Sequence, residues 1–243
     1  MATEHILTAG PALTAQHFNA SYWYLKQAVS GTSGGRNTVW FIQPSGAFTE
    51  GAAALNSQEE WVLRHYYRGG LPGKLVRKEF IYTGLEQARA VAEFNLLTAM
   101  QSLSLPVPKP IGAYVQRKGL TYQASILIER IAASEDLGRL LLKQPLPHEQ
   151  WQQVGATIKR FHQAGVFHSD LNCKNILWRN EPESVYLIDF DRCDIRTVDN
   201  SWQQQNLARL KRSFEKERNI AQANNAEFHW SPEHWQALLA GYQ

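Results

Sequence analysis

Two polar segments in the C-terminal half, each beside an apolar run, constrain this chain most. The first holds Asp170 and, five residues later, Asn175, and the second ends an apolar run with Asp189. Residues 175–178 and 185–188 have the composition of short strands, and the stretch between them contains Asn and Pro, which favour turns. We therefore predict a β-hairpin that brings Asn175 and Asp189 to the same end of two neighbouring strands.

These three side chains suit the transfer of a phosphoryl group. The Asp170 carboxylate can accept the proton of an attacking hydroxyl, and oxygen atoms of Asn175 and Asp189 can hold Mg²⁺ against phosphates. The spacing is close to the H-R-D-L-x-x-x-N and D-F-G patterns. The alternative for the first segment is a turn between buried strands, and the second segment argues against it. We expect an ATP- and Mg²⁺-dependent phosphotransferase with an alcohol acceptor, and we expect His168 to hold the loop by hydrogen bonds.

Composition narrows the class of protein. The 243 residues are 44% hydrophobic and 19% charged, which is typical of a folded chain large enough for two lobes. A net charge of +3 does not argue for a nucleic-acid partner. The sequence has no apolar run that could cross a bilayer and no export signal at its start. Two cysteines are too few for a disulfide framework, so a reduced, cytoplasmic setting is the default. We expect His229 and His234 to be surface residues.

The pattern of elements predicts an α+β fold in two lobes. Residues 1–128 are expected to form a strand-rich N-lobe with one main helix that ends near residue 103, and residues 129–243 a mainly helical C-lobe. Strands are expected at 39–42, 60–66, 114–117 and 125–128. A helix is expected after Pro147, ending at Gly165, with the last helices at about 200–220 and 231–241.

A glycine cluster in the N-lobe, just before the first expected hairpin, is a candidate phosphate-binding loop. Gly31, Gly34 and Gly35 would let backbone N–H groups approach the phosphates closely. The alternative is a flexible turn, because the pattern is not G-x-G-x-x-G.

Arg64 and Glu93 are the next candidates. Glu93 lies on an apolar helical stripe and needs a partner if it is buried; the alternative places it at the edge of the stripe. Arg64 stands where a V-A-I-K pattern would have its lysine, and its planar fork can bind both Glu93 and a phosphate of ATP. Lys74 and Lys78 are alternative cations.

Residues 125–131 have the composition of a hinge strand between the lobes. Backbone groups near Glu129 and Ile131 would bond to the edge of adenine there. A plain buried strand would have the same side chains.

Together these segments resemble the protein-kinase-like fold, and within it the lipopolysaccharide kinase family, most closely the 3-deoxy-D-manno-octulosonic acid (Kdo) kinases of Gram-negative bacteria. The resemblance covers roughly residues 30–215, but the chain has no A-P-E segment after Asp189 and has Asn172 where protein kinases usually have lysine. It is carried by residues 63–66, 68–70, 93–97, 106–108, 167–172 and 187–192.

The resemblance implies phosphorylation of the 4-hydroxyl of Kdo on a Kdo–lipid A precursor, at the cytoplasmic face of the bacterial inner membrane, by a peripheral protein. The basic and aromatic segment 64–78 would suit an anionic glycolipid, or it is a solvated loop. A small-molecule kinase of the aminoglycoside or choline type, and a kinase-fold binding module without activity, are the alternatives.

Overall fold

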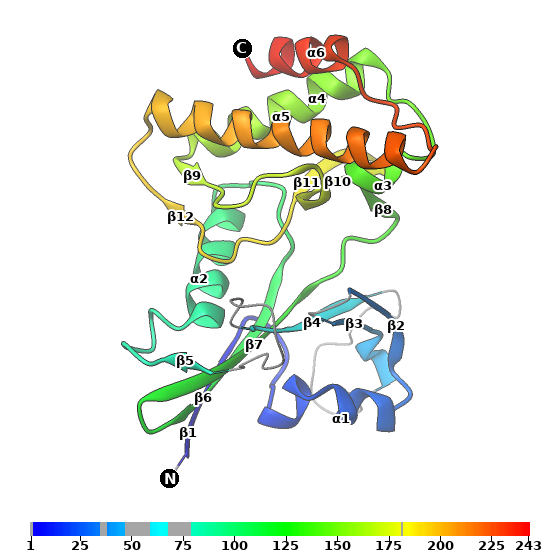
Figure 1. The fold of residues 1–243 in the computed structure, drawn as a ribbon. Helices are drawn as coiled ribbons and strands as arrows, with labels where there is room; N and C mark the ends of the chain where they lie inside the picture. The colour runs from blue at the N-terminus through cyan, green and yellow to red at the C-terminus, as the bar shows by residue number, and fades with distance from the viewer. Residues whose placement is uncertain (1, 35–37, 47–58, 68–78, 181) are drawn as a thin grey trace. The chain divides into compact units, whose positions relative to one another are not determined.

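The computed structural model describes residues 2–34, 38–46, 59–67, 79–180 and 182–243. The chain divides into two compact units, which are taken separately below. The first comprises Met1–Thr98 with Pro108–Ile131, and the second Ala99–Val107 with Ala132–Gln243. Figure 1 shows the strands of the first unit and the long helices of the second.

The first unit is built on an antiparallel sheet in the order β1-β6-β7-β4-β3-β2, with β5 paired to β7. Short helical segments precede β2 and follow β3, and α2 begins in this unit and ends in the second. The strands are β1 (Ala2–Thr8), β2 (Val29–Ser33), β3 (Val39–Ile42), β4 (Trp61–His65), β5 (Phe80–Ile81), β6 (Pro110–Lys118) and β7 (Thr121–Glu129). The helical segments are η1 (Ala15–Phe18), α1 (Ala20–Leu25), η2 (Pro44–Gly46) and α2 (Arg89–Ser102).

Alternation along β4 positions the candidate cation. Trp61 and Leu63 are completely buried on one face of the strand, where Trp61 meets Trp23 of α1 with the ring centroids 6.0 Å apart. Arg64 directly follows Leu63, and successive side chains of a strand alternate, so Arg64 points to the other face of the sheet. A hydrophobic core on one face thus directs the arginine to the opposite one.

The second unit is mainly helical, with short strands that carry the polar segments. Its helices are α3 (Leu137–Leu140), α4 (His148–Gln163), η3 (Cys173–Asn175), α5 (Asn200–Ala223) and α6 (Pro232–Tyr242). Its strands are β8 (Ser134–Asp136), β9 (Val166–Phe167), β10 (Ile176–Asn180), β11 (Glu183–Leu187) and β12 (Asp194–Ile195). Aromatic rings fill its core: Trp151 of α4 meets Phe214 of α5 edge-on at 5.4 Å, and Phe214 stacks on Trp230 at 5.7 Å.

Most of the expected elements are present. The hairpin β10–β11 pairs Ile176 with Leu187, and α4, α5 and α6 lie at or near the predicted positions. Gly165 ends the α4 region with φ +77°, a conformation that favours glycine.

Other expectations were wrong in detail. The glycine cluster does not precede the first hairpin, because Gly31 lies within β2, which pairs with β3, and Gly34 directly follows β2. The main helix ends at Ser102, close to the expected residue 103, but the short strand β5, which precedes its start at Arg89, was not expected. His234 is not a simple surface residue, since its ring stacks on Trp151 at 5.4 Å.

Candidate active site

His168 organises the loop that carries the polar segments. Its side chain is 2% exposed, its Nδ1 accepts a hydrogen bond from the Asp170 N–H at 3.2 Å, and its Nε2 lies 3.0 Å from the Ile188 carbonyl oxygen. With Nδ1 as the acceptor, Nε2 carries the proton and donates to that carbonyl. Burial lowers the pKa of His168, which favours this neutral form. The imidazole therefore joins the residue before Asp189 to the backbone of Asp170.

Asn175 ties the end of the loop to Asp170. Its Nδ2 donates to the Asp170 carbonyl oxygen at 2.9 Å, and its own carbonyl oxygen accepts from Ile188 N at 3.0 Å. Because the amide nitrogen is used in this way, Oδ1 is the side-chain atom that would bind a metal, and this role stays a prediction. The loop and the start of β10 thus hold an amide oxygen beside the candidate base.

Asp189 follows β11 in a conformation that is uncommon for a residue with a side chain. Its φ is +64°, in the left-handed region, and Ile188 before it is fixed by its bonds to Asn175 and His168. Such backbone conformations are costly and occur often at functional sites. Next to it, Phe190 is buried between the rings of Phe161 and His168, at 6.0 and 5.0 Å.

The carboxylate of Asp170 is half-exposed and has two partners. Oδ1 accepts from Arg209 Nε at 3.0 Å and from Nη2 at 2.5 Å, and Oδ2 lies 3.2 Å from Asn172 Nδ2. Each oxygen retains a lone pair for a substrate hydroxyl. The Arg209 contact was not predicted, because it joins residues 39 positions apart and no local pattern marks it.

One face of α5 binds the whole loop. Asn206 Oδ1 accepts from His168 N at 3.2 Å, and Ser213 Oγ accepts from Cys173 N at 3.0 Å. Glu217, one turn further, forms a 2.8 Å ion pair with Lys174. With Arg209, these residues recur at intervals of three and four, so they share one side of the helix. We refer to Asn206, Arg209, Ser213 and Glu217 as the α5 clamp.

In the first unit, Arg64 of β4 and Glu93 of α2 form an ion pair. The Glu93 side chain is 2% exposed, and its Oε2 also accepts from Tyr66 Oη at 2.5 Å. The Arg64 guanidinium lies 5.1 Å from the centre of the Tyr66 ring. The pairing expected from sequence is therefore present; whether Arg64 also binds a phosphate stays a prediction.

The remaining candidates of the first unit are less defined. Gly34 has φ +110°, which requires glycine, whereas a Cβ on Gly31 would only touch Phe41 at 3.4 Å. Gly35 lies outside the described residues. Glu129 N donates to Lys109 O at 2.8 Å, so its N–H is already used and only its carbonyl could face an adenine. Ile131 is buried, and its role stays a prediction.

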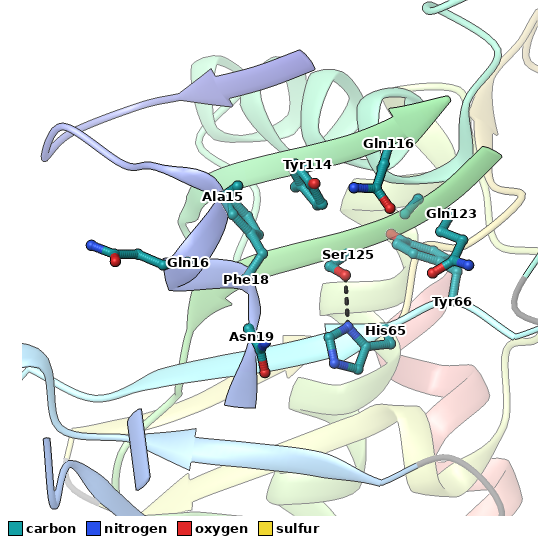
Figure 2. Close-up of a pocket in the computed structure, with 11 residues that line it drawn as sticks. Ala15, Gln16, Phe18, Asn19, His65, Tyr66, Tyr114, Gln116, Gln123 and Ser125 are labelled. Atoms are coloured by element: carbon teal, nitrogen blue, oxygen red, sulfur yellow. Dashed lines mark hydrogen bonds between the residues drawn. The ribbon is translucent and has the colours of Figure 1, made fainter. Parts of the chain in front are cut away.

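The first unit contains a pocket of about 440 Å³, and Figure 2 shows the residues that line it. His65 Nδ1 and Ser125 Oγ, which are hydrogen-bonded at 2.6 Å, form part of its wall. Among the described residues, its lining contains neither lysine nor arginine. The lining is Ala15, Gln16, Phe18, Asn19, His65, Tyr66, Tyr114, Gln116, Gln123, Ala124 and Ser125.

The basic segment, the cysteines and possible membrane-spanning helices are the remaining features considered from the sequence. Lys74, Lys78 and most of the basic segment lie outside the described residues. Cys173 is buried, which raises the pKa of its thiol to about 11, and it does not have the character of a nucleophile. Within the described ranges, no helix is both long and apolar enough to span a membrane.

Comparison with known proteins gives a consistent result. The family model "Lipopolysaccharide kinase (Kdo/WaaP) family" matches residues 20–242. A protein of Mannheimia succiniciproducens named 3-deoxy-D-manno-octulosonic acid kinase is 43% identical over 94% of this chain and 90% of its own. Proteins with the same name from Vibrio vulnificus and Haemophilus influenzae are 42% and 40% identical over 93% of this chain, covering 88% and 90% of their own.

The fold has a solved counterpart. A structure titled "WaaP in complex with acyl carrier protein" aligns with a TM-score of 0.58 at 13% identity, covering 98% of this chain and 88% of that one. This likeness confirms the predicted α+β, protein-kinase-like fold. The chain belongs to the lipopolysaccharide kinase (Kdo/WaaP) family.

Proposed function

We propose that this protein transfers the γ-phosphoryl group of ATP to the 4-hydroxyl of Kdo on a Kdo–lipid A precursor. The observation that carries the proposal is 40–43% identity to proteins named Kdo kinases along nearly the whole chain. The polar loop of the second unit supplies groups that suit this chemistry. We place the reaction in the synthesis of the lipopolysaccharide core.

Asp170 acts as the base in this proposal. The acceptor hydroxyl donates a hydrogen bond to the exposed carboxylate, and its proton passes to Asp170 as its oxygen bonds to the γ-phosphorus. The bond from that phosphorus to the β-γ bridging oxygen breaks, and ADP leaves. His168 and Asn175 hold the Asp170 backbone from two sides, which keeps the carboxylate oriented.

Asn175 and Asp189 provide the ligands for magnesium. Asn175 directs its nitrogen to a backbone carbonyl and keeps Oδ1 for a cation, and Asp189 adds a carboxylate. Mg²⁺ commonly takes one or two protein carboxylates and completes its shell with water and phosphate oxygens. When bound, the ion would neutralise charge on the phosphates.

Arg64 is proposed to bind a phosphate of ATP. Its pairing with Glu93 and Tyr66 fixes the guanidinium, and arginine has five N–H donors, so the pair does not exhaust its bonding capacity. Arginine can therefore replace the lysine of the usual pattern. Glu129 and Ile131 are proposed to contact adenine, and Gly31, Gly34 and Gly35 the phosphates.

We also propose that the protein acts at the cytoplasmic side of the inner membrane as a peripheral protein. The acceptor's acyl chains stay in the bilayer, so the protein must reach a sugar at the surface. The basic segment 64–78 is the proposed contact.

Phosphate transfer from labelled ATP tests the function. We expect Kdo–lipid IVA to gain the mass of one phosphate, with choline and aminoglycosides unchanged. Asp170→Asn should lower kcat by roughly 10²–10⁴-fold, as loss of a general base does. Asp194→Asn, an exposed carboxylate paired with Arg196 in the same unit, is the matched control and should leave kcat unchanged. Phosphorylation of choline or an aminoglycoside instead of the glycolipid would refute the proposal.

A further inference from the structure

Arg209 differs from the other residues of the α5 clamp in its exposure. Asn206 is 2% exposed and Ser213 and Glu217 are partly covered, as suits residues that support a loop. The Arg209 and Asp170 side chains are 48% and 52% exposed. An ion pair this open to solvent adds little to stability. The position beside the proposed base, rather than support of the fold, is what distinguishes this arginine.

The guanidinium of Arg209 has donors to spare. Nε and Nη2 both bond to Oδ1 of Asp170, at 3.0 and 2.5 Å. Arginine carries five N–H groups in a fixed plane, so this edge-on contact uses two and leaves three. Within the described part of the chain, no acceptor is recorded for Nη1. A second anion can therefore bind to the other edge of the fork while Asp170 keeps its contact.

The chemistry of the proposed acceptor supplies that anion. Kdo is a sugar acid whose carboxylate is attached to ring carbon C2, and a single carbon, C3, separates C2 from the C4 that carries the reacting hydroxyl. When this hydroxyl meets Asp170, the acceptor carboxylate comes near the carboxylate of the base. Two like charges at that separation repel, and a cation between them removes the repulsion. Arg209 already contacts one of the two carboxylates.

We propose that Arg209 is the residue that binds the acceptor's carboxylate, and that it selects a sugar acid over a neutral sugar. The inference rests on the proposed function and adds to it a specificity-determining residue outside the sequence motifs. Asn172 stands where protein kinases usually have a lysine, and the lysine of the loop, Lys174, pairs with Glu217. Arg209 of α5 instead provides the cation beside the base, and we place the acceptor's carboxylate against it.

The test combines a change in the enzyme with the matching change in the acceptor. KM and kcat are measured for wild type and Arg209→Ala, with Kdo–lipid IVA and with its Kdo methyl ester, which keeps the 4-hydroxyl and lacks the charge. We expect esterification to raise the wild-type KM about 10- to 100-fold, the usual range for a hydrogen bond between charged groups. Arg209→Ala should raise the KM for the acid by a similar factor and should discriminate little between acid and ester.

Arg212→Ala is the matched control, because it removes the same charge from an exposed position one turn along α5. It should change neither constant. Arg209→Lys, which keeps the charge and loses the fork, should recover part of the affinity for the acid. It also replaces Arg209→Ala in the test if the alanine variant does not fold.

Two outcomes would overturn the assignment. Equal losses of kcat on acid and ester would make Arg209 a residue that only positions Asp170, and a raised KM for ATP would assign it to the phosphates. If wild type transfers no phosphate to Kdo–lipid IVA, the proposed function fails instead. Calorimetry of free Kdo with wild type and Arg209→Ala then decides the carboxylate subsite, and equal or absent binding rejects it.

Discussion

Glu93 is a buried carboxylate that pairs with Arg64 and accepts a hydrogen bond from Tyr66. Removing the cation from a buried ion pair typically costs about 3–5 kcal/mol. Arg64→Ala should therefore lower the free energy of unfolding by about that amount and raise the KM for ATP.

Urea denaturation and steady-state kinetics measure these two effects of Arg64→Ala. Arg64→Lys should recover part of both, because it keeps the charge without the fork. Lys143→Ala, which breaks an exposed pair with Glu135, is the control and should cost about 1 kcal/mol or less. An unchanged KM for ATP in Arg64→Ala would remove Arg64 from the phosphates, whatever its effect on stability.

His162 makes stability depend on pH. Burial lowers its pKa to about 4; its Nδ1 lies 2.8 Å from Tyr242 Oη, and its ring meets Trp202 edge-on. In the unfolded chain this histidine takes up a proton near pH 6.5, whereas in the folded chain it does so only near pH 4. The contribution of neutral His162 to the free energy of unfolding is therefore complete above pH 6.5 and is lost as the pH falls towards 4. Between pH 7.5 and 5.0 the loss amounts to about 2 kcal/mol.

Urea midpoints at the two pH values measure this dependence. His162→Gln should have a weaker dependence than wild type, even if it is less stable at both pH values. His5→Gln, which changes a partly exposed histidine of β1, is the control. Parallel curves for wild type and His162→Gln would mean that other groups carry the pH dependence.

At the scale of elements, α4 and α6 pack backbone to backbone through two glycines. A Cβ on Gly155 would lie 1.9 Å from the Leu238 carbonyl oxygen, and one on Gly241 would lie 2.0 Å from that of Gln152. The helices must separate to admit either methyl group. In an exposed helix the same change favours stability, because alanine is the better helix former.

Gly155→Ala should therefore destabilise the protein by about 1–3 kcal/mol, as overpacking does. Thermal unfolding followed by circular dichroism measures the change. Gln153→Ala, at an exposed position of the same helix, is the control and should be neutral or slightly stabilising. A melting temperature for Gly155→Ala at or above the wild-type value would show that α4 and α6 pack less closely.

How well the sequence predicts a contact depends on how far apart in the chain the two residues lie. Asn175 and Asp189 belong to a local hairpin, and their placement follows from strand and turn composition. Glu93 could be paired with Arg64 because a buried carboxylate on a helix needs a cation. Nothing local marks Arg209, and nothing local shows that β1 pairs with β6, more than a hundred residues later. Contacts of that kind depend on how distant elements meet.

For the whole molecule, the question is how it reaches a lipid-bound acceptor. Arg68, Arg77 and Lys78 lie outside the described residues, and their sequence context supports an electrostatic contact. Each contributes about 1 kcal/mol near an anionic surface, and salt screens the attraction. Changing all three to Gln should release the protein from anionic vesicles in a sedimentation assay, as should raised salt.

Activity of this triple variant on a deacylated, soluble acceptor should stay close to that of wild type. Changing Lys26, Lys159 and Lys211 to Gln together removes the same charge elsewhere and is the control. Vesicle binding that survives molar salt would point to aromatic side chains rather than charge.

The α5 clamp also determines when, during translation of the chain, the catalytic loop can make all of its contacts. The residues of the catalytic loop leave the ribosome well before Asn206, Arg209, Ser213 and Glu217, which bind their backbone and side chains. Until α5 emerges and folds, the loop lacks four of its contacts and Asp170 lacks its cation. The growing chain can therefore complete the contacts of the catalytic loop only after Glu217 of α5 has been synthesised.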